Sequence, residues 1–85
     1  MKVTEVEVLA AIKRIQYHRF EGTTVTVCCL SLDNDFTATG ESACVDPVEY
    51  NQELGESIAY KNAFNKVWGY LGFRLAEKLA TQKEG

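Results

Sequence analysis

The chain has 85 residues, of which 46% are hydrophobic and 25% charged. This length and composition predict one globular domain over residues 1–85, with a frayed tail at residues 81–85. Nine basic and twelve acidic residues give a net charge of −3, so the basic surface that binds duplex nucleic acid is missing. No apolar run approaches the roughly 18 residues that span a bilayer, and the N-terminus is unlike a secretory signal. We therefore expect a cytosolic protein with no membrane segment.

The cysteines and the single histidine offer little chemistry. An odd number of cysteines, Cys28, Cys29 and Cys44, argues against a disulfide framework and indicates free thiols. His18 could approach Cys28 or Glu41 across a sheet, but no CxxC or HxxxH spacing supports a metal site. A helix starting at Asp46 could lower the pKa of the Cys44 thiol, yet no nucleophile motif surrounds this residue. We expect no metal, no cofactor and no enzymatic activity.

The first half of the chain predicts one helix followed by three strands. Thr4 and Glu7 form a capping box at the start of a helix over Thr4–Arg14. Alternating apolar and polar residues, separated by the short turns at residues 21–23 and 33–35, then indicate strands. Turns this short permit only antiparallel pairing, so the strands form a meander. The predicted strands are Ile15–Phe20, Thr24–Leu32 and Phe36–Ala43.

The second half of the chain predicts a long helix. Asp46, Pro47 and Glu49 are typical of a helix start, and helical spacing continues to Ala80. An unbroken helix of this length would measure about 50 Å, whereas a compact chain of this size is roughly 30 Å across. The helix must therefore break, or project and pack on another subunit. We favour a break near Asn51, with two helical glycines (Gly69 and Gly72) as alternatives.

These elements predict an α+β fold of α-β-β-β-α order, with both helices on one face of the sheet. Phe64, Trp68 and Leu71 are expected in the core, and Tyr70 and Phe73 in an exposed apolar patch. The other face of the sheet is expected to be half polar. It would carry His18, Phe20, Thr24, Thr26, Cys28, Leu30, Leu32, Thr37, Thr39 and Glu41. The candidate binding residues on this face are His18, Thr26, Thr37, Thr39 and Glu41.

Several short strings carry a resemblance to a known family. They are Tyr17–Phe20, Gly22–Thr24, Thr26–Leu30, Phe36-Thr37, Thr39–Cys44, Pro47, Gly55, Ile58–Tyr60, Asn62-Ala63, Lys66–Trp68, Gly72 and Leu75. Through them Ile15–Leu79 resembles a family of small phage and prophage proteins. The family is named after early gene products of a lytic coliphage and a temperate Shigella phage, gp-forty-nine and gp-sixty-six. The N-terminal helix lies outside the resemblance, and Asp33–Asp35 replaces a turn that is often of Lys-Asn-Gly type in the family.

The resemblance implies a phage or prophage origin and residence in the cytoplasm of the infected bacterium. It names no reaction and no site residues. Our leading hypothesis is a non-enzymatic accessory protein that binds a host protein, and we expect a homo-oligomer, with a dimer as the first guess. The alternative is sequestration of a nucleotide-type signal of host defence in pockets between subunits, lined by some of Lys61, Lys66 and Arg74. A thiol enzyme using Cys44 or Cys28 is a third hypothesis that no motif favours.

Overall fold

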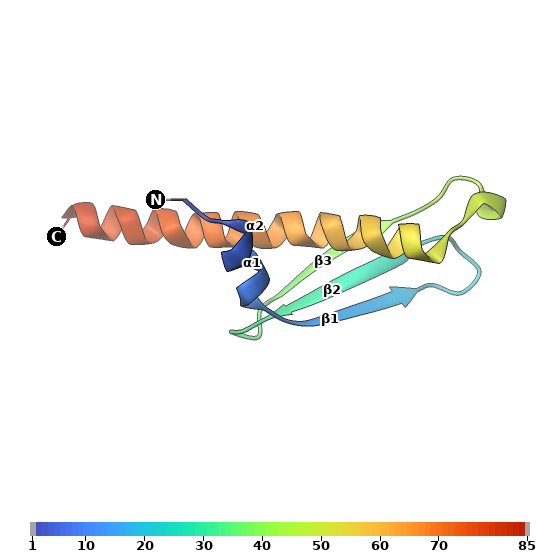
Figure 1. Cartoon of the computed structure of the whole chain (residues 1–85), viewed down its shortest axis with the longest axis horizontal. Coiled ribbons are helices and arrows are strands. Elements are labelled where there is room, and N and C mark those ends of the chain that lie inside the picture. The colour runs from blue at the N-terminus through green and yellow to red at the C-terminus, as the bar shows by residue number, and fades with distance from the viewer. Residues whose placement is uncertain (1, 85) are drawn as a thin grey trace.

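The computed structural model describes residues 2–84. Its elements are α1 (Glu5–Ala11), β1 (Ile12–Arg19), β2 (Thr26–Leu32), β3 (Thr37–Ser42), the short 3-10 helix η1 (Pro47–Glu49) and α2 (Gln52–Glu84). The strands form one antiparallel sheet in the order β1-β2-β3. Both α-helices lie on the same face of this sheet (Figure 1). The predicted α+β fold is therefore confirmed.

The boundary between α1 and β1 comes earlier than predicted. The Thr4 side chain caps α1 by accepting a hydrogen bond from the Glu7 backbone N–H, but the helix ends at Ala11 and β1 starts at once. The pairing register then shifts between Ile12 and Arg14, which marks a β-bulge. The bulge turns Ile12 and Ile15 toward the same side of the sheet. Ile12 continues the helical spacing of Val8, Leu9 and Ala11, so the sequence pattern extended the predicted helix too far.

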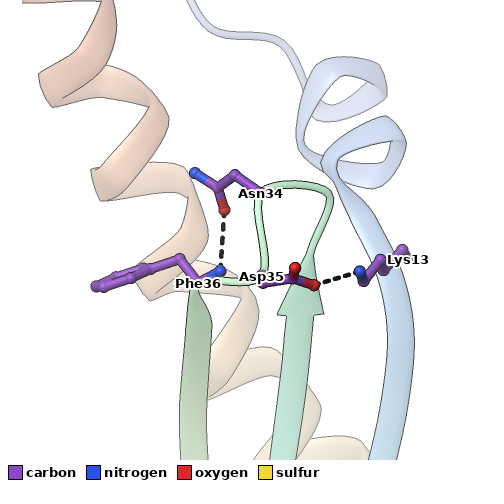
Figure 2. A network of polar contacts seen from close by, with 4 residues as sticks. All are labelled: Lys13, Asn34, Asp35 and Phe36. Carbon is purple, nitrogen blue, oxygen red and sulfur yellow. Dashed lines mark hydrogen bonds and ion pairs between the residues drawn. The ribbon is translucent and has the colours of Figure 1, made fainter.

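The turn between β2 and β3 holds β1 in place as well. Asn34 Oδ1 accepts a hydrogen bond of 3.0 Å from the Phe36 backbone N–H, and the Asp35 carboxylate forms an ion pair with Lys13 (Figure 2). Asp35 has a φ of 69°, a left-handed conformation that aspartate tolerates better than most residues. The predicted turn is confirmed, and it also reaches across to the bulge in β1.

Side-chain contacts replace the first two residues of the predicted strand Thr24–Leu32. β2 begins at Thr26 and not at Thr24. The Thr24 hydroxyl instead donates to the Cys44 carbonyl at 2.6 Å and accepts from the Cys44 backbone N–H at 3.1 Å. Gly22, with a φ of 78°, forms the preceding turn. Thr24 thus ties the start of β2 to the segment that follows β3.

The core lies between the sheet and a stripe of small residues on α2. The stripe repeats every fourth residue, which places its members on one side of a helix. They are Ala59, Ala63, Val67 and Leu71. The facing residues of β2 alternate with half-buried ones, and they are Thr26, Cys28, Leu30 and Leu32. The sequence pattern places these four residues on the sheet face turned away from the helices. That placement is wrong, and the pattern could not decide it because both sides of β2 are apolar enough to face a helix.

The predicted break near Asn51 is confirmed. Asp46 caps η1 by accepting from the Val48 backbone N–H, and Asn51 Oδ1 accepts from the Leu54 backbone N–H at 3.1 Å. After this cap, α2 runs unbroken for 33 residues, through Gly69 and Gly72 and on to Glu84. Gly85 lies outside the described residues. The result is an elongated molecule of 58 × 21 × 18 Å.

The aromatic residues of α2 divide into buried and exposed sets. Phe64 packs against the core, as predicted. Trp68 was also expected there, but its side chain is 38% exposed because it lies to one side of the buried stripe. Tyr70 and Phe73 are exposed, as predicted, and the Tyr70 ring meets that of Phe36 edge-on at 5.3 Å between centroids. The far end of α2 therefore carries apolar surface that the sheet does not cover.

Candidate functional site

The face of the sheet opposite the helices is a regular grid of nine residues, which we call the open face. The register places three of them from each strand in three rows across the sheet. The rows are Arg14, Ser31 and Thr37; Gln16, Cys29 and Thr39; and His18, Val27 and Glu41. Four of the five predicted binding residues, His18, Thr37, Thr39 and Glu41, therefore share this face.

His18 and Glu41 share a row but do not touch. Both pair with Val27 of the central strand, so two strand spacings, or about 10 Å, separate them. The imidazole instead meets the Phe20 ring edge-on, with 4.8 Å between ring centroids. The register therefore does not permit His18 to reach Glu41, and the two side chains form opposite borders of one surface.

Thr26 does not belong to the open face. It points toward α2, is only 1% exposed, and its hydroxyl lies 3.1 Å from the Tyr50 hydroxyl. The Arg19 guanidinium covers the Tyr50 ring at 4.0 Å from its centroid. The predicted placement of Thr26 on the same face as the other candidate residues is wrong, because its place in the alternation of β2 puts it on the buried side. Its hydroxyl instead joins β2 to the residue that follows η1.

The thiols occupy three unrelated environments. Cys28 is buried on the helix side of the sheet, so the predicted approach of His18 to it is wrong. Burial raises the pKa of the Cys28 thiol, and a charge on Cys29 would raise it further, which favours the protonated form at neutral pH. The Cys44 thiol donates a 3.1 Å hydrogen bond to the Asp46 carbonyl. Cys29 lies in the middle row of the open face.

Most clefts of residues 2–84 lie on the helix side, and a small one of about 170 Å³ is lined in part by Val27, Thr39 and Glu41 of the open face. A cleft on the helix side, which we call the basic cleft, measures about 460 Å³ and lies between α1 and α2, with Lys2, Arg74 and Lys78 on its rim. Sequence reasoning selected Arg74 but not its two neighbours, because they come from parts of the chain that only the fold brings together. Lys61 and Lys66 line other clefts, so one protomer does not join them to Arg74.

Two further findings concern the described residues as a whole. Within residues 2–84, no group of three or more His, Cys, Asp or Glu side chains is placed to hold a metal ion. In the same part of the chain, no helix combines the length and the apolar character needed to cross a membrane.

Comparison with known proteins identifies the family. A search of curated proteins and a search of solved structures each gave no match. The model of one protein family matches residues 3–79. The match confirms the resemblance found in the sequence and extends it over α1, which the resemblance left out. Because nearly the whole chain is covered, it belongs to the phage protein (N4 Gp49/phage Sf6 gene 66) family.

Proposed function

We propose that this chain is a non-enzymatic accessory protein of a phage that binds a host protein in the cytoplasm of the infected bacterium. The observation that carries the proposal is the composition of the open face. Its central strand carries two half-buried apolar side chains, Val27 and Cys29, beside the half-buried Ser31, and its borders are exposed and polar. Protein interfaces have this arrangement, with an apolar centre and a polar rim. In residues 2–84, both α-helices pack on the other face.

The test compares capture of E. coli proteins by variants of the open face. We expect the wild-type protein, purified from an E. coli extract, to retain a host protein whose mass appears under native conditions and separates on denaturation. His18→Ala with Glu41→Ala should lose this protein, because the change alters both borders of the open face while leaving the core intact. A matched control, Glu77→Ala with Gln82→Ala, changes two exposed side chains of α2 and should retain it. Equal capture by all three proteins would exclude the open face.

We also propose that the protein is a homodimer. Support comes from α2, which is about 50 Å long in a molecule only 21 Å wide. Its far half carries exposed apolar side chains such as Phe73. Contact with a second copy would bury this surface. Light scattering should give twice the mass of one chain, and Phe73→Glu should shift the protein to the monomer; a monomeric wild type would contradict the proposal.

The basic cleft favours a second candidate, sequestration of a nucleotide-type signal of host defence. The lining of this cleft of about 460 Å³ includes three basic side chains (Lys2, Arg74 and Lys78) and two acidic ones (Glu7 and Asp33). The lining therefore carries a net positive charge, which favours the binding of phosphate groups. A panel of cyclic nucleotides should raise the thermal midpoint of the wild type, and Arg74→Ala with Lys78→Ala should remove that shift. No shift with any nucleotide would count against this candidate and leave host-protein binding as the function.

A further inference from the structure

The two edges of the sheet differ in how closely α2 approaches them. At the β3 edge, the Asn62 side chain of α2 donates a 2.8 Å hydrogen bond to the Glu41 carbonyl. α2 packs mainly on β3 and β2 and leaves β1 farthest from it (Figure 1). β1 is therefore an edge strand of eight residues that the long helix does not cover. Unpaired backbone groups on such an edge are a template for another strand.

Exposed apolar side chains lie beside this edge, on the helix side of the sheet, and we call the space that they border the groove. Ile15 and Tyr17 of β1 face the helices but remain 47% and 41% exposed. A cleft of about 480 Å³ between α1 and α2 has a mixed lining of Glu5, Leu9, Ser57, Tyr60, Lys61, Phe64, Asn65 and Trp68. The Phe64 and Trp68 rings lie 5.9 Å apart between centroids. An added strand would therefore meet both a free backbone edge and a row of apolar side chains.

Aromatic side chains border the groove on its strand side, with Tyr17, and on its helix side, with Tyr60 and Phe64. Tyr17 pairs with Cys28 across the sheet. Burial raises the pKa of both tyrosines, and a charge on Cys28 would raise both further. The Tyr60 and Phe64 rings are 5.7 Å apart between centroids.

The charge of β1 selects the kind of strand that fits. Residues 12–19 include Lys13, Arg14 and Arg19 and no acid. Lys13 is paired with Asp35, and Arg19 covers Tyr50 and donates to the Thr23 carbonyl. Arg14 makes no such contact in the part of the chain that the structure describes. A second copy of β1 that paired antiparallel over residues 13–19 would place Lys13 of one strand opposite Arg19 of the other, which opposes that pairing.

We infer that the free edge of β1 binds an extended segment of a partner protein in which acidic and apolar residues alternate. The apolar side chains enter the groove beside Ile15 and Tyr17, and the acidic ones lie on the open face beside Arg14. Strand addition of this kind takes affinity from backbone hydrogen bonds and selectivity from alternate side chains. The inference rests on the proposed host-protein binding and names the chemistry of the segment that is bound.

The test uses a synthetic probe with the full-length protein. We take a blocked peptide of alternating Glu and Val, a counterpart of alternating Lys and Val, and a Glu-Val peptide methylated on alternate backbone nitrogens. We expect the Glu-Val peptide to shift the amide resonances of residues 12–19 saturably, with a Kd below about 1 mM. The Lys-Val and methylated peptides should bind at least tenfold more weakly, because the first lacks complementary charge and the second cannot complete the ladder.

Charge variants complete the test. Arg14→Glu should weaken binding of the Glu-Val peptide at least tenfold and improve binding of the Lys-Val peptide. Lys66→Glu, the same change of charge beside β3, should leave the affinity within about twofold. No saturable shift, equal binding of the methylated peptide, or shifts centred on β3 would overturn the inference. Because the probe needs no host protein, failure of capture from an extract would overturn the proposed function and leave this result intact.

Discussion

Gly40 of β3 lies directly against Ala63 of α2. A Cβ atom built on Gly40 would be 2.2 Å from the Ala63 backbone nitrogen and 2.4 Å from the Ala59 carbonyl oxygen. Both obstacles are backbone atoms, which cannot move aside without shifting the helix. The absence of a side chain at Gly40, together with the alanines of α2, sets how closely the helix approaches the sheet.

Gly40→Ala should therefore destabilise the protein by about 3 kcal/mol, at the upper end of what overpacking costs. Urea denaturation followed by circular dichroism measures the change. Gly69→Ala is the matched control, because a Cβ there meets nothing within 4 Å and alanine favours a helix interior by about 1 kcal/mol. A loss of stability in the Gly69 variant equal to that of the Gly40 variant would refute this account of the packing.

The hydrogen bond between Thr26 and Tyr50 should stabilise the fold and play no part in binding. Thr26→Val and Tyr50→Phe should each lower the free energy of unfolding by about 1 kcal/mol, because each leaves the other hydroxyl without its partner. The double variant should lose less than the sum of the two. Additive losses would show that the hydroxyls do not interact, and loss of host-protein capture by Thr26→Val would restore Thr26 to the site.

The cap at Asn51 should fix where α2 begins. Asn51→Ala removes the acceptor for the Leu54 backbone N–H and should cost about 1 kcal/mol. Asn51→Ser keeps an acceptor at the cap, so its stability should remain close to that of the wild type. Thermal denaturation of the three proteins measures the difference. Equal stability of the alanine and serine variants would mean that the cap contributes nothing.

Local chemistry made much of the fold predictable. Turn residues, the capping box at Thr4 and the helix start at Asp46 are signals that act over a few residues, and each of them was read correctly. The β-bulge before Arg14 could not be foreseen, because pairing with β2 creates it. Helix propensity alone also could not predict that α2 continues through Gly69 and Gly72. The two glycines cost little free energy relative to the contacts along the rest of the helix.

For the candidate site, the sequence predicted which residues of a strand share a face, but not which face of the sheet that is. Alternation correctly grouped Thr37, Thr39 and Glu41 on one side of β3. It could not decide which side of β2 faces the helix, since Val27 and Leu30 are equally suited to a core. Thr26 was therefore assigned to the wrong face. The groove beside Tyr17 gave no signal in the sequence, because it depends on where α2 crosses the sheet.

The ion pair between Lys13 and Asp35 (Figure 2) should make stability depend on pH in acid. The hydrogen bond from Lys13, followed by its charge, lowers the pKa of Asp35 below the ordinary value of 3.8. A carboxyl with a lower pKa in the folded state contributes stability that is present above pH 3.8 and is lost as the pH falls through the folded pKa. Both side chains are exposed, so the effect is small and screened by salt.

Asp35→Asn is the variant that isolates this contribution, because asparagine also tolerates the left-handed backbone at this turn. We expect the wild type to be more stable than the variant at neutral pH and low salt, and this difference to vanish as the pH falls below the folded pKa of Asp35. Urea denaturation at a series of pH values measures it, and added salt should reduce it at neutral pH. A difference that persists unchanged in acid would show that Asp35 acts through the backbone of the turn and not through its charge.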